Sequence, residues 1–475
     1  MILPKTITLN AFTGDGVTVS GNVAEHGNRW GGVGDELAKQ APLAPGGAAG
    51  PADWAHVDIG WGVVMADRED LSAREKADGV DAPDPIRALI AARGNAPVLR
   101  YRKDLGERKL ARYFADGTRQ DPEIGLTPFG TGKGRLPLYL LIVGSPTEIP
   151  WRLQYSLNRR HHVGRLDLPG PALSNYVNAL LSDWAGIDCD PTKSVVWSVN
   201  YDSITQKMEI TIAERISRAM GTDNELSISR IEGDAATKAA LVAALRGASP
   251  AVVVTSSHGK TGPLNDADAM RRTLGLPVDA NRETLDTEDL LGAWEPSGAV
   301  WYAQACCSAG SGDGTSYDGL LDAGSVAHEV VGAVAELGAG VAPLPTKLLG
   351  ATKPLRAFLG HVEPTFDWTL LVSDTGQYLT DPLVDAIYPN IYRRCPLGLA
   401  LDAHYRGVGE LYGKLENART GINNLVPGAR EDATYFRLTA TDRQSLVILG
   451  DPAVVIPPLP SQTADPGTGR CEVKM

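Results

Sequence analysis

Residues 250–260 read PAVVVTSSHGK, and residues 299–314 read AVWYAQACCSAGSGDG. Each stretch opens with a short, continuously apolar run, which is typical of a strand in a sheet covered on both faces. Polar residues follow at once: His258 and Gly259 after the first run, and Cys306 after the second. In parallel α/β sheets, functional groups gather at the carboxyl ends of the strands. The two stretches therefore predict a parallel sheet with His258 and Cys306 at one edge.

Similar apolar runs occur elsewhere in the chain. They read LYLLIVG at 138–144, VVWSVN at 195–200, LRAFLG at 355–360 and SLVILG at 445–450. Between the runs lie segments with apolar residues at three-to-four spacing, at 205–220, 235–246 and 397–418. Such spacing indicates amphipathic helices. The alternation predicts an α/β fold with a largely parallel sheet.

Composition divides the chain into four parts. We expect a Gly/Pro-rich N-terminal extension of unknown fold and function at 1–95, a first α/β half at 96–245, a catalytic half at 246–460 and a tail at 461–475. The polar excursion at 260–297, with one short helical candidate at 286–293, is typical of a binding or gating loop.

Net charge excludes some classes of partner. The 475-residue chain has a formal net charge of −12, which opposes binding to nucleic acid or to an anionic membrane surface. No apolar run is long enough to span a bilayer, and the N-terminal MILPKTITLNAFTGDG does not read as an export signal. We expect a protein substrate, with no nucleic acid and no membrane as partner.

The cysteine set is odd and sparse. Its five members, at positions 189, 306, 307, 395 and 471, include no CxxC pair, so we expect neither a disulfide framework nor a zinc site. The adjacent His161 and His162 would point to opposite faces of a strand, which disfavours a shared metal ion. These features predict a cytoplasmic protein without a metal or other cofactor.

A thiol beside an imidazole can perform nucleophilic catalysis. The imidazole of His258 would take the proton of Cys306 and later deliver one to the leaving amine. Gly259 allows close approach of a substrate carbonyl, so its N–H and that of Cys306 could form an oxyanion hole. Taken singly, His258 and Cys306 would more often be structural residues. A histidine at a strand end is commonly a hydrogen-bonded structural residue, and a buried cysteine commonly packs as a small apolar side chain.

Spacing favours the joint interpretation. His258 precedes Cys306 by 306 − 258 = 48 residues, and Gln304-Ala305-Cys306 matches the first half of the caspase signature, whose histidine lies about 50 residues upstream. After Cys306 the chain departs from that signature, which leaves Cys307 as an alternative nucleophile. His361 also follows an apolar run and is a competing base.

Over about 136–457 the chain resembles the caspase-fold (clan CD-like) cysteine peptidases, most closely their bacterial gingipain-type branch. Three segments carry the resemblance besides the His-Gly and Gln-Ala-Cys stretches. They are LYLLIVGSPTEIPW with HHVGRLDL at 138–168, LRAFLGHVEPTFDW at 355–368 and SLVILGDPAVVIP at 445–457. The resemblance implies a three-layer αβα sandwich and a metal-free endopeptidase with His258 as general base and Cys306 as nucleophile.

The resemblance leaves the specificity open. The branch often carries an acidic residue before its Gly-Arg strand, which receives a basic P1 side chain, whereas this chain has Arg159 and Arg160 there. These arginines would suit an acidic P1 residue. Asp313 and Asp318 follow the nucleophile in the chain, and their carboxylates leave a preference for a basic P1 residue possible. We expect Gln304, Asp313, Arg159 and Arg160 to contact the substrate.

Three functions follow from these expectations. The first is a cysteine endopeptidase that cuts one or a few proteins through a thioester, after activation by a partner or by processing, in a bacterial stress or defence pathway. The second is a catalytically silent caspase-like scaffold or sensor that binds a protein segment. The third is acyl transfer through the same thioester chemistry.

Overall fold

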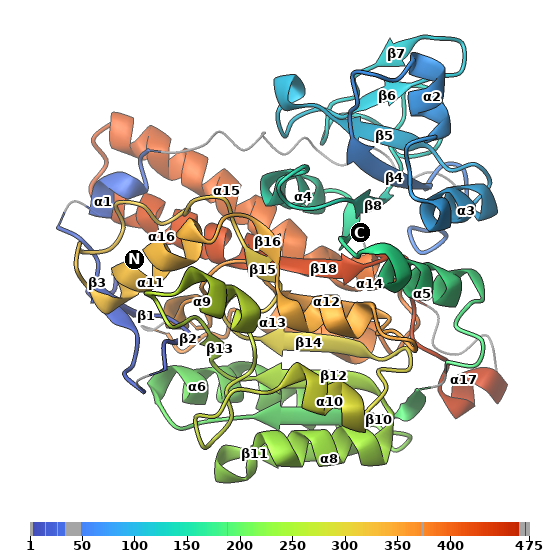
Figure 1. Cartoon of the computed structure of the whole chain (residues 1–475). Helices are drawn as coiled ribbons and strands as arrows, with labels where there is room; N and C mark the ends of the chain where they lie inside the picture. The colour runs from blue at the N-terminus through green and yellow to red at the C-terminus, as the bar shows by residue number, and fades with distance from the viewer. Residues whose placement is uncertain are drawn as a thin grey trace.

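A twelve-stranded sheet organises the computed structural model, which describes residues 3–14, 16–25, 27–33, 49–187, 189–371, 375–464 and 471. In spatial order its strands are β11 (Ser227–Glu232), β10 (Asp190–Ser198), β12 (Pro250–Ser256), β14 (Val300–Gln304), β17 (Ala357–His361), β18 (Leu446–Gly450), β9 (His162–Leu166), β8 (Tyr139–Val143), β4 (Trp61–Ala66), β5 (Val98–Tyr101), β6 (Ala111–Tyr113) and β7 (Arg119–Gln120). Neighbours are parallel except at β17–β18, β5–β6 and β6–β7. Helices flank the sheet (Figure 1). The expected α/β class is confirmed, and the arrangement is consistent with a three-layer sandwich.

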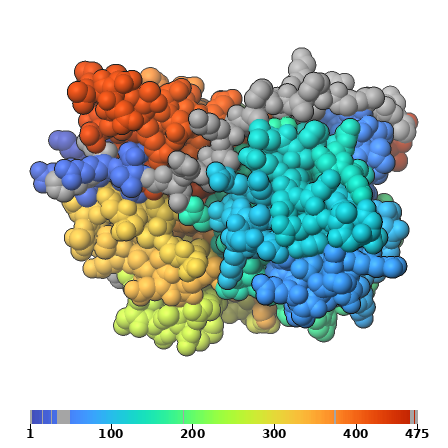
Figure 2. Space-filling model, turned by 90° about the horizontal axis from the view of Figure 1, so that it is seen from above, coloured from blue at the N-terminus to red at the C-terminus, as the bar shows by residue number. Residues whose placement is uncertain are grey.

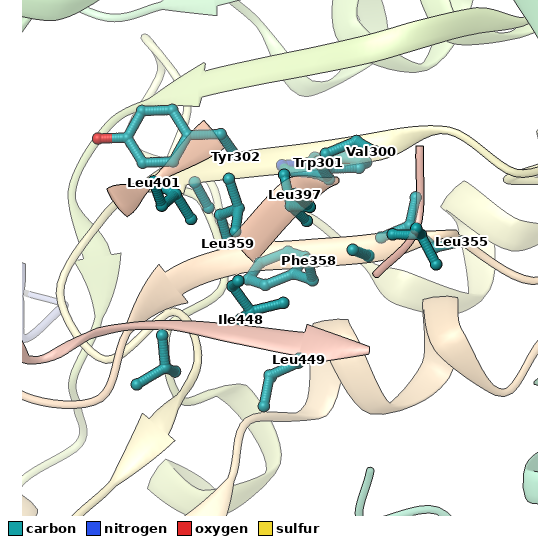
Figure 3. Packing of buried hydrophobic residues seen from close by; sticks show 14 of the residues in the cluster. Val300, Trp301, Tyr302, Leu355, Phe358, Leu359, Leu397, Leu401, Ile448 and Leu449 are labelled. Carbon is teal, nitrogen blue, oxygen red and sulfur yellow. The ribbon is translucent and has the colours of Figure 1, made fainter. Parts of the chain in front are cut away.

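All six predicted apolar runs form strands of this sheet: β8, β10, β12, β14, β17 and β18. Their side chains are buried because helices cover the sheet. Figure 3 shows this packing at β14, β17 and β18, where Trp301, Phe358 and Ile448 lie in one cluster. The ring centroids of Trp301 and Phe358 are 6.4 Å apart. Burial of such large side chains contributes about 1.5–3 kcal/mol each to folding.

The predicted helices are also present. The predicted segment 205–220 forms α6 (Ser203–Met208), a π-helical turn (Glu209–Ala213) and α7 (Glu214–Met220). The segment 235–246 corresponds to α8 (Lys238–Ala248), and the segment 286–293 corresponds to α10 (Thr287–Ala293). The segment 397–418 forms α14 (Leu397–Ala400) and most of α15 (Asp402–Asn423). Further helices are α1 (Gly27–Trp30), α2 (Ala73–Asp78), α3 (Asp84–Ala92), α4 (Trp151–Asn158), α5 (Gly170–Leu181), α9 (Ala267–Thr273), α11 (Val326–Glu336), α12 (Pro343–Leu349), α13 (Asp381–Asp385), α16 (Ala429–Gln444) and α17 (Pro460–Ala464).

The N-terminal 95 residues do not form one separate extension. β4 lies between β8 and β5 in the main sheet, so the expected boundary at residue 95 falls between two paired strands. The boundary at 245 likewise falls inside α8. The strand Trp61–Ala66 was not predicted because the sequence around it is rich in Gly and Pro. Its Val63 and Val64 are fully buried. The tail begins in α17, and its residues 465–470 and 472–475 lie outside the described residues.

The first residues of the chain lie far from β4, against residues 246–460. β1 (Thr6–Thr8) pairs with β3 (Ser20–Asn22), and β2 (Ala11–Phe12) pairs with β13 (Gly259–Lys260). Figure 2 shows this segment, in dark blue, between the orange-red α15–α16 region and the yellow-orange residues that follow β14. A further two-stranded sheet joins β15 (Gly310–Ser311) to β16 (Gly340–Val341).

A disulfide joins Cys395 to Cys471. The odd, sparse cysteine set predicts no disulfide framework, whereas two of the five cysteines do pair. Cys395 and Cys471 are 76 positions apart in the chain, so their spacing gives no local sign of the pairing. Within the described ranges, no helix has both the length and the apolar character needed to cross a membrane.

Candidate active site

The loops that follow β12 and β14 meet at one edge of the sheet. These strands are adjacent and parallel, with Ser256 opposite Gln304, so His258 and Cys306 both come two residues after the paired ends. The two loops touch at Gly259, where an added Cβ would lie only 2.0 Å from the carbonyl oxygen of Cys306. Only glycine permits this approach, which is the physical reason for the His-Gly sequence.

Asp202 orients the imidazole of His258. Its carboxylate Oδ2 accepts a hydrogen bond from Nε2 of His258 at 2.7 Å. Asp202 follows β10, the strand next to β12, and is also the N-cap of α6, where it accepts a bond from the amide of Thr205 at 3.0 Å. Burial alone would raise the pKa of Asp202, but the hydrogen bonds from His258 and Thr205 outweigh it and lower the pKa to about 2. The carboxylate is therefore ionised at neutral pH.

The other imidazole nitrogen remains available. With the proton on Nε2 held by Asp202, Nδ1 of His258 carries a free lone pair. Nδ1 is buried, and no group in the described part of the chain forms a hydrogen bond with it. The ring of Tyr201 lies beside the imidazole, with centroids 5.6 Å apart. A buried, oriented and unpartnered nitrogen is suited to accept a proton from a neighbouring acid.

The thiol of Cys306 is fully buried. Its sulfur accepts a hydrogen bond from the backbone amide of Thr365 at 3.0 Å. Burial raises the pKa of Cys306 to about 12, and the hydrogen bond from Thr365 offsets only part of that rise. The thiol is thus protonated at neutral pH, so it needs a base or a change of environment to become a nucleophile.

Two backbone amides converge beside this thiol. The N–H groups of Gly259 and Cys306 both donate to the carbonyl oxygen of Asn10, at 3.3 Å each. These are the two amides that the sequence suggested as an oxyanion hole. A paired donor site of this kind stabilises negative charge that develops on a carbonyl oxygen.

Cys307 has a different environment. It adopts a left-handed φ of 55°, and its amide donates to the carbonyl of Glu363 rather than to Asn10. Burial raises the pKa of Cys307 well above its ordinary value. The converging amides therefore favour Cys306 over Cys307 as the nucleophile.

His361 is held within the core. Its Nδ1 lies 3.2 Å from the Ser445 hydroxyl and its Nε2 lies 3.3 Å from Oε1 of Gln304. Burial lowers the pKa of His361 to about 3. With both ring nitrogens engaged and a low basicity, His361 is a structural residue rather than a competing base.

The four residues expected to contact substrate lie in different places. Gln304 lies at the site: its backbone carbonyl is 3.5 Å from Nδ2 of Asn10. Asp313 lines a cleft of about 930 Å³, together with Trp151, Tyr155 and the buried Glu363.

Arg159 and Arg160 contact other parts of the molecule. The guanidinium of Arg159 lies 5.7 Å from the ring centroid of Tyr412 in α15. Arg160 donates to the carbonyl of Gly125 and lies 5.2 Å from the Phe129 ring centroid. β9, which they precede, is separated from β14 by β18 and β17. These contacts give both arginines a structural role, and none of them involves the dyad.

Sequence reasoning missed Asp202, Thr365 and Asn10. Asp202 carried a signal, since it closely follows the apolar run 195–200 and so belongs to the same strand edge as His258. The contacts of Thr365 and Asn10 with the thiol and the oxyanion amides come from backbone groups, which any residue type provides. Across the described ranges no group of three or more His, Cys, Asp or Glu side chains could hold a metal ion.

Comparison of the chain with protein-family models, with curated proteins and with solved structures finds no match. Interpretation of the site therefore depends on its own geometry. That geometry combines an Asp–His pair, a buried thiol and two converging amides. Together these are the parts needed for acyl transfer to a thiol.

Proposed function

We propose that the protein is a caspase-like cysteine endopeptidase in which His258 is the general base and Cys306 the nucleophile. The observation that carries the proposal is the convergence of the Gly259 and Cys306 amides on one carbonyl oxygen. A nucleophile that contributes its own amide to an oxyanion hole is placed next to the carbon it attacks. The gingipain-type resemblance of the sequence supports the same assignment.

In this mechanism Nδ1 of His258 accepts the proton of Cys306. The thiolate attacks the substrate carbonyl, and the Gly259 and Cys306 amides stabilise the oxyanion. His258 then protonates the leaving amine, and a thioester remains on Cys306. Water hydrolyses the thioester with His258 again as base. Asp202 is a positioning residue, which fixes the tautomer of His258 and stabilises the imidazolium.

The proposal needs no metal or other cofactor, because the thiol, the imidazole and the amides supply the chemistry. Its substrate is a protein, and its setting is a bacterial stress or defence pathway. The compartment stays a prediction: the sparse cysteines led us to expect the cytoplasm, whereas disulfides such as Cys395–Cys471 are typical of oxidising compartments.

Cleavage of a peptide library, read by mass spectrometry, tests the proposal. We expect the wild-type protein to cut and the Cys306→Ala variant to lose at least about 10³-fold in kcat/KM. Cys307→Ala is the matched control, since it removes the adjacent thiol and should retain activity. Undiminished cleavage by Cys306→Ala would refute the assignment.

A silent scaffold is the second candidate, and one observation favours it. The thiol is buried, its pKa is raised to about 12, and the Asn10 segment lies against the oxyanion amides. A protein that only binds a segment of its partner beside His258 and Cys306 would leave every library peptide intact. Its Cys306 would also remain unmodified by iodoacetamide when peptide is present.

A further inference from the structure

The N-terminal segment 8–12 lies against the candidate site in the manner of a bound peptide. The backbone amide of Asn10 donates to the carbonyl of Thr365 at 2.9 Å, and Leu9 forms an antiparallel bridge with Phe366. One residue earlier, the amide of Thr8 donates to the Asp367 carboxylate at 3.1 Å. Residues 8–10 therefore pair with the backbone of residues 365–367, which is how extended peptides are recognised.

Past the oxyanion amides the chain continues into β2. Ala11 and Phe12 pair in parallel with Gly259 and Lys260, and the amide of Thr261 donates to the carbonyl of Phe12 at 2.9 Å. Backbone bonds thus hold the chain on both sides of the Asn10 carbonyl. In a peptidase this carbonyl belongs to the P1 residue, and the next peptide bond is the one that breaks.

The side chain of Asn10 is also recognised. Asn10 is only 1% exposed. Its Nδ2 donates to the carbonyl of Gln304 at 3.5 Å, while its Oδ1 is buried and has no hydrogen-bond donor among the described residues. An aspartate here would place an unpaired charge in a buried site and would present an acceptor to the Gln304 carbonyl. Such a burial is costly, so the pocket discriminates an amide from a carboxylate.

We propose that Asn10–Ala11 is the first bond this site cuts, in its own chain, and that the site prefers asparagine at P1. The inference rests on the proposed peptidase function. The intact chain is then a latent form, because the Asn10 carbonyl occupies the oxyanion amides. Cutting separates residues 1–10 from the rest of the chain and frees the oxyanion amides for another substrate.

The chemical step balances within the site. The sulfur of Cys306 bonds to the carbonyl carbon of Asn10 as its proton passes to Nδ1 of His258. The Asn10–Ala11 C–N bond breaks, and His258 returns that proton to the new amine of Ala11. Water then cleaves the thioester, which gives the Asn10 carboxylate and restores the thiol.

The test follows the purified full-length chain by intact-mass and N-terminal mapping under denaturing conditions. We expect a product that begins at Ala11, formed at a rate independent of protein concentration. Cys306→Ala should stay intact, and Asn10→Asp should cut at least 10-fold more slowly. Asn22→Asp, the same change on the partner strand β3, is the control and should cut like the wild type.

A peptide assay keeps the inference testable where Asn10→Asp disturbs the N-terminal hairpin. The peptide TITLNAFT, which copies residues 6–13, should be cut after asparagine by the wild-type protein, and TITLDAFT should not. Equal cutting of both peptides would overturn the P1 preference. A wild-type chain that keeps its Asn10–Ala11 bond while it cuts other peptides would overturn self-cleavage and leave the peptidase function standing. Failure to cut any peptide would overturn both.

Discussion

Asp202 performs two roles through one carboxylate: it holds Nε2 of His258 and caps α6. The two roles can be separated by substitution, since asparagine is as good an N-cap as aspartate but cannot stabilise an imidazolium by charge. This residue therefore allows a test of catalysis that is independent of folding.

We expect Asp202→Asn to lower kcat/KM by about 10²- to 10⁴-fold while it keeps the N-cap of α6. Asp202→Ala should show the same loss and also unfold more easily, by about 1 kcal/mol, because the cap is lost. Peptidase kinetics and urea unfolding measure the two effects. Full activity in Asp202→Asn would remove Asp202 from the mechanism.

Gly259 offers a second prediction at this scale. A methyl group at Gly259 would collide with the backbone of Cys306, so Gly259→Ala must open the oxyanion hole. We expect a loss of at least about 10²-fold in kcat with little change in substrate affinity. The control is Gly247→Ala in α8, where an added Cβ meets nothing within 4 Å. Equal activity of the two variants would contradict the assigned role of Gly259.

At the residue scale, the sequence placed His258, Gly259 and Cys306 at one strand edge because each follows a strand that is readable from its apolar run. Asn10 could not be found in that way. It reaches the site through tertiary pairing of β2 with β13, and neither two-residue strand leaves a periodic pattern.

At the scale of elements, Arg165 links β9 to the turn after β8 and to α4. Its guanidinium is fully buried and donates to the carbonyls of Gly144 and Ile149 and to the side chain of Gln154. Burial lowers the pKa of Arg165 to about 9, so it stays charged at neutral pH. The planar guanidinium serves three acceptors at once, which a lysine cannot do.

Arg165→Lys should lower the free energy of unfolding by about 2–4 kcal/mol, because acceptors buried beside β9 lose their donors. Arg74→Lys is the control: Arg74 is 77% exposed in α2, and its replacement should change stability by less than about 0.5 kcal/mol. Urea unfolding of both variants measures the difference. Equal stability would show that the Arg165 contacts do not hold these elements together.

The strands that the sequence predicted share a property that β4 and β5 lack. The predicted strands lie in apolar runs that alternate with amphipathic helices, whereas β4 is embedded in a Gly/Pro-rich region and β5 has only four residues. An apolar run as short as a strand is ambiguous without such an alternation around it. Tertiary pairing with β8 fixes β4 in place, and no local pattern reports that pairing.

For the molecule as a whole, two buried carboxyl groups reduce stability as the pH rises. Burial raises the pKa of Glu363 to about 7, against the hydrogen bonds from Ser316, and raises that of Asp442 to about 7, against those from Thr369 and Phe366. Each group keeps its proton in the folded state at a pH where the unfolded state has lost it. Their contribution is therefore fully present below about pH 4 and is lost as the pH rises through about 7.

Between about pH 4.5 and pH 7, each of these carboxyl groups should lower the free energy of unfolding by on the order of 3 kcal/mol. Buried histidines such as His361 act in the opposite direction up to about pH 6.5, because burial lowers the pKa of His361 to about 3. The carboxyl effect is therefore measured as the difference between variant and wild type, and Glu363→Gln and Asp442→Asn should each remove it, since an amide does not titrate. Urea unfolding across this range in which the double variant shows the same pH dependence as the wild type would contradict the role of the two carboxyl groups.

The central claim is that Cys306 forms a thioester with the peptide it cuts. Acid quenching during turnover of TITLNAFT, followed by peptide mapping, would locate the acyl group directly. We predict an adduct of the TITLN fragment on Cys306, which is absent from His258→Ala. An adduct on Cys307 or Ser308, or continued cleavage with no adduct in the Cys306→Ala variant, would contradict the account.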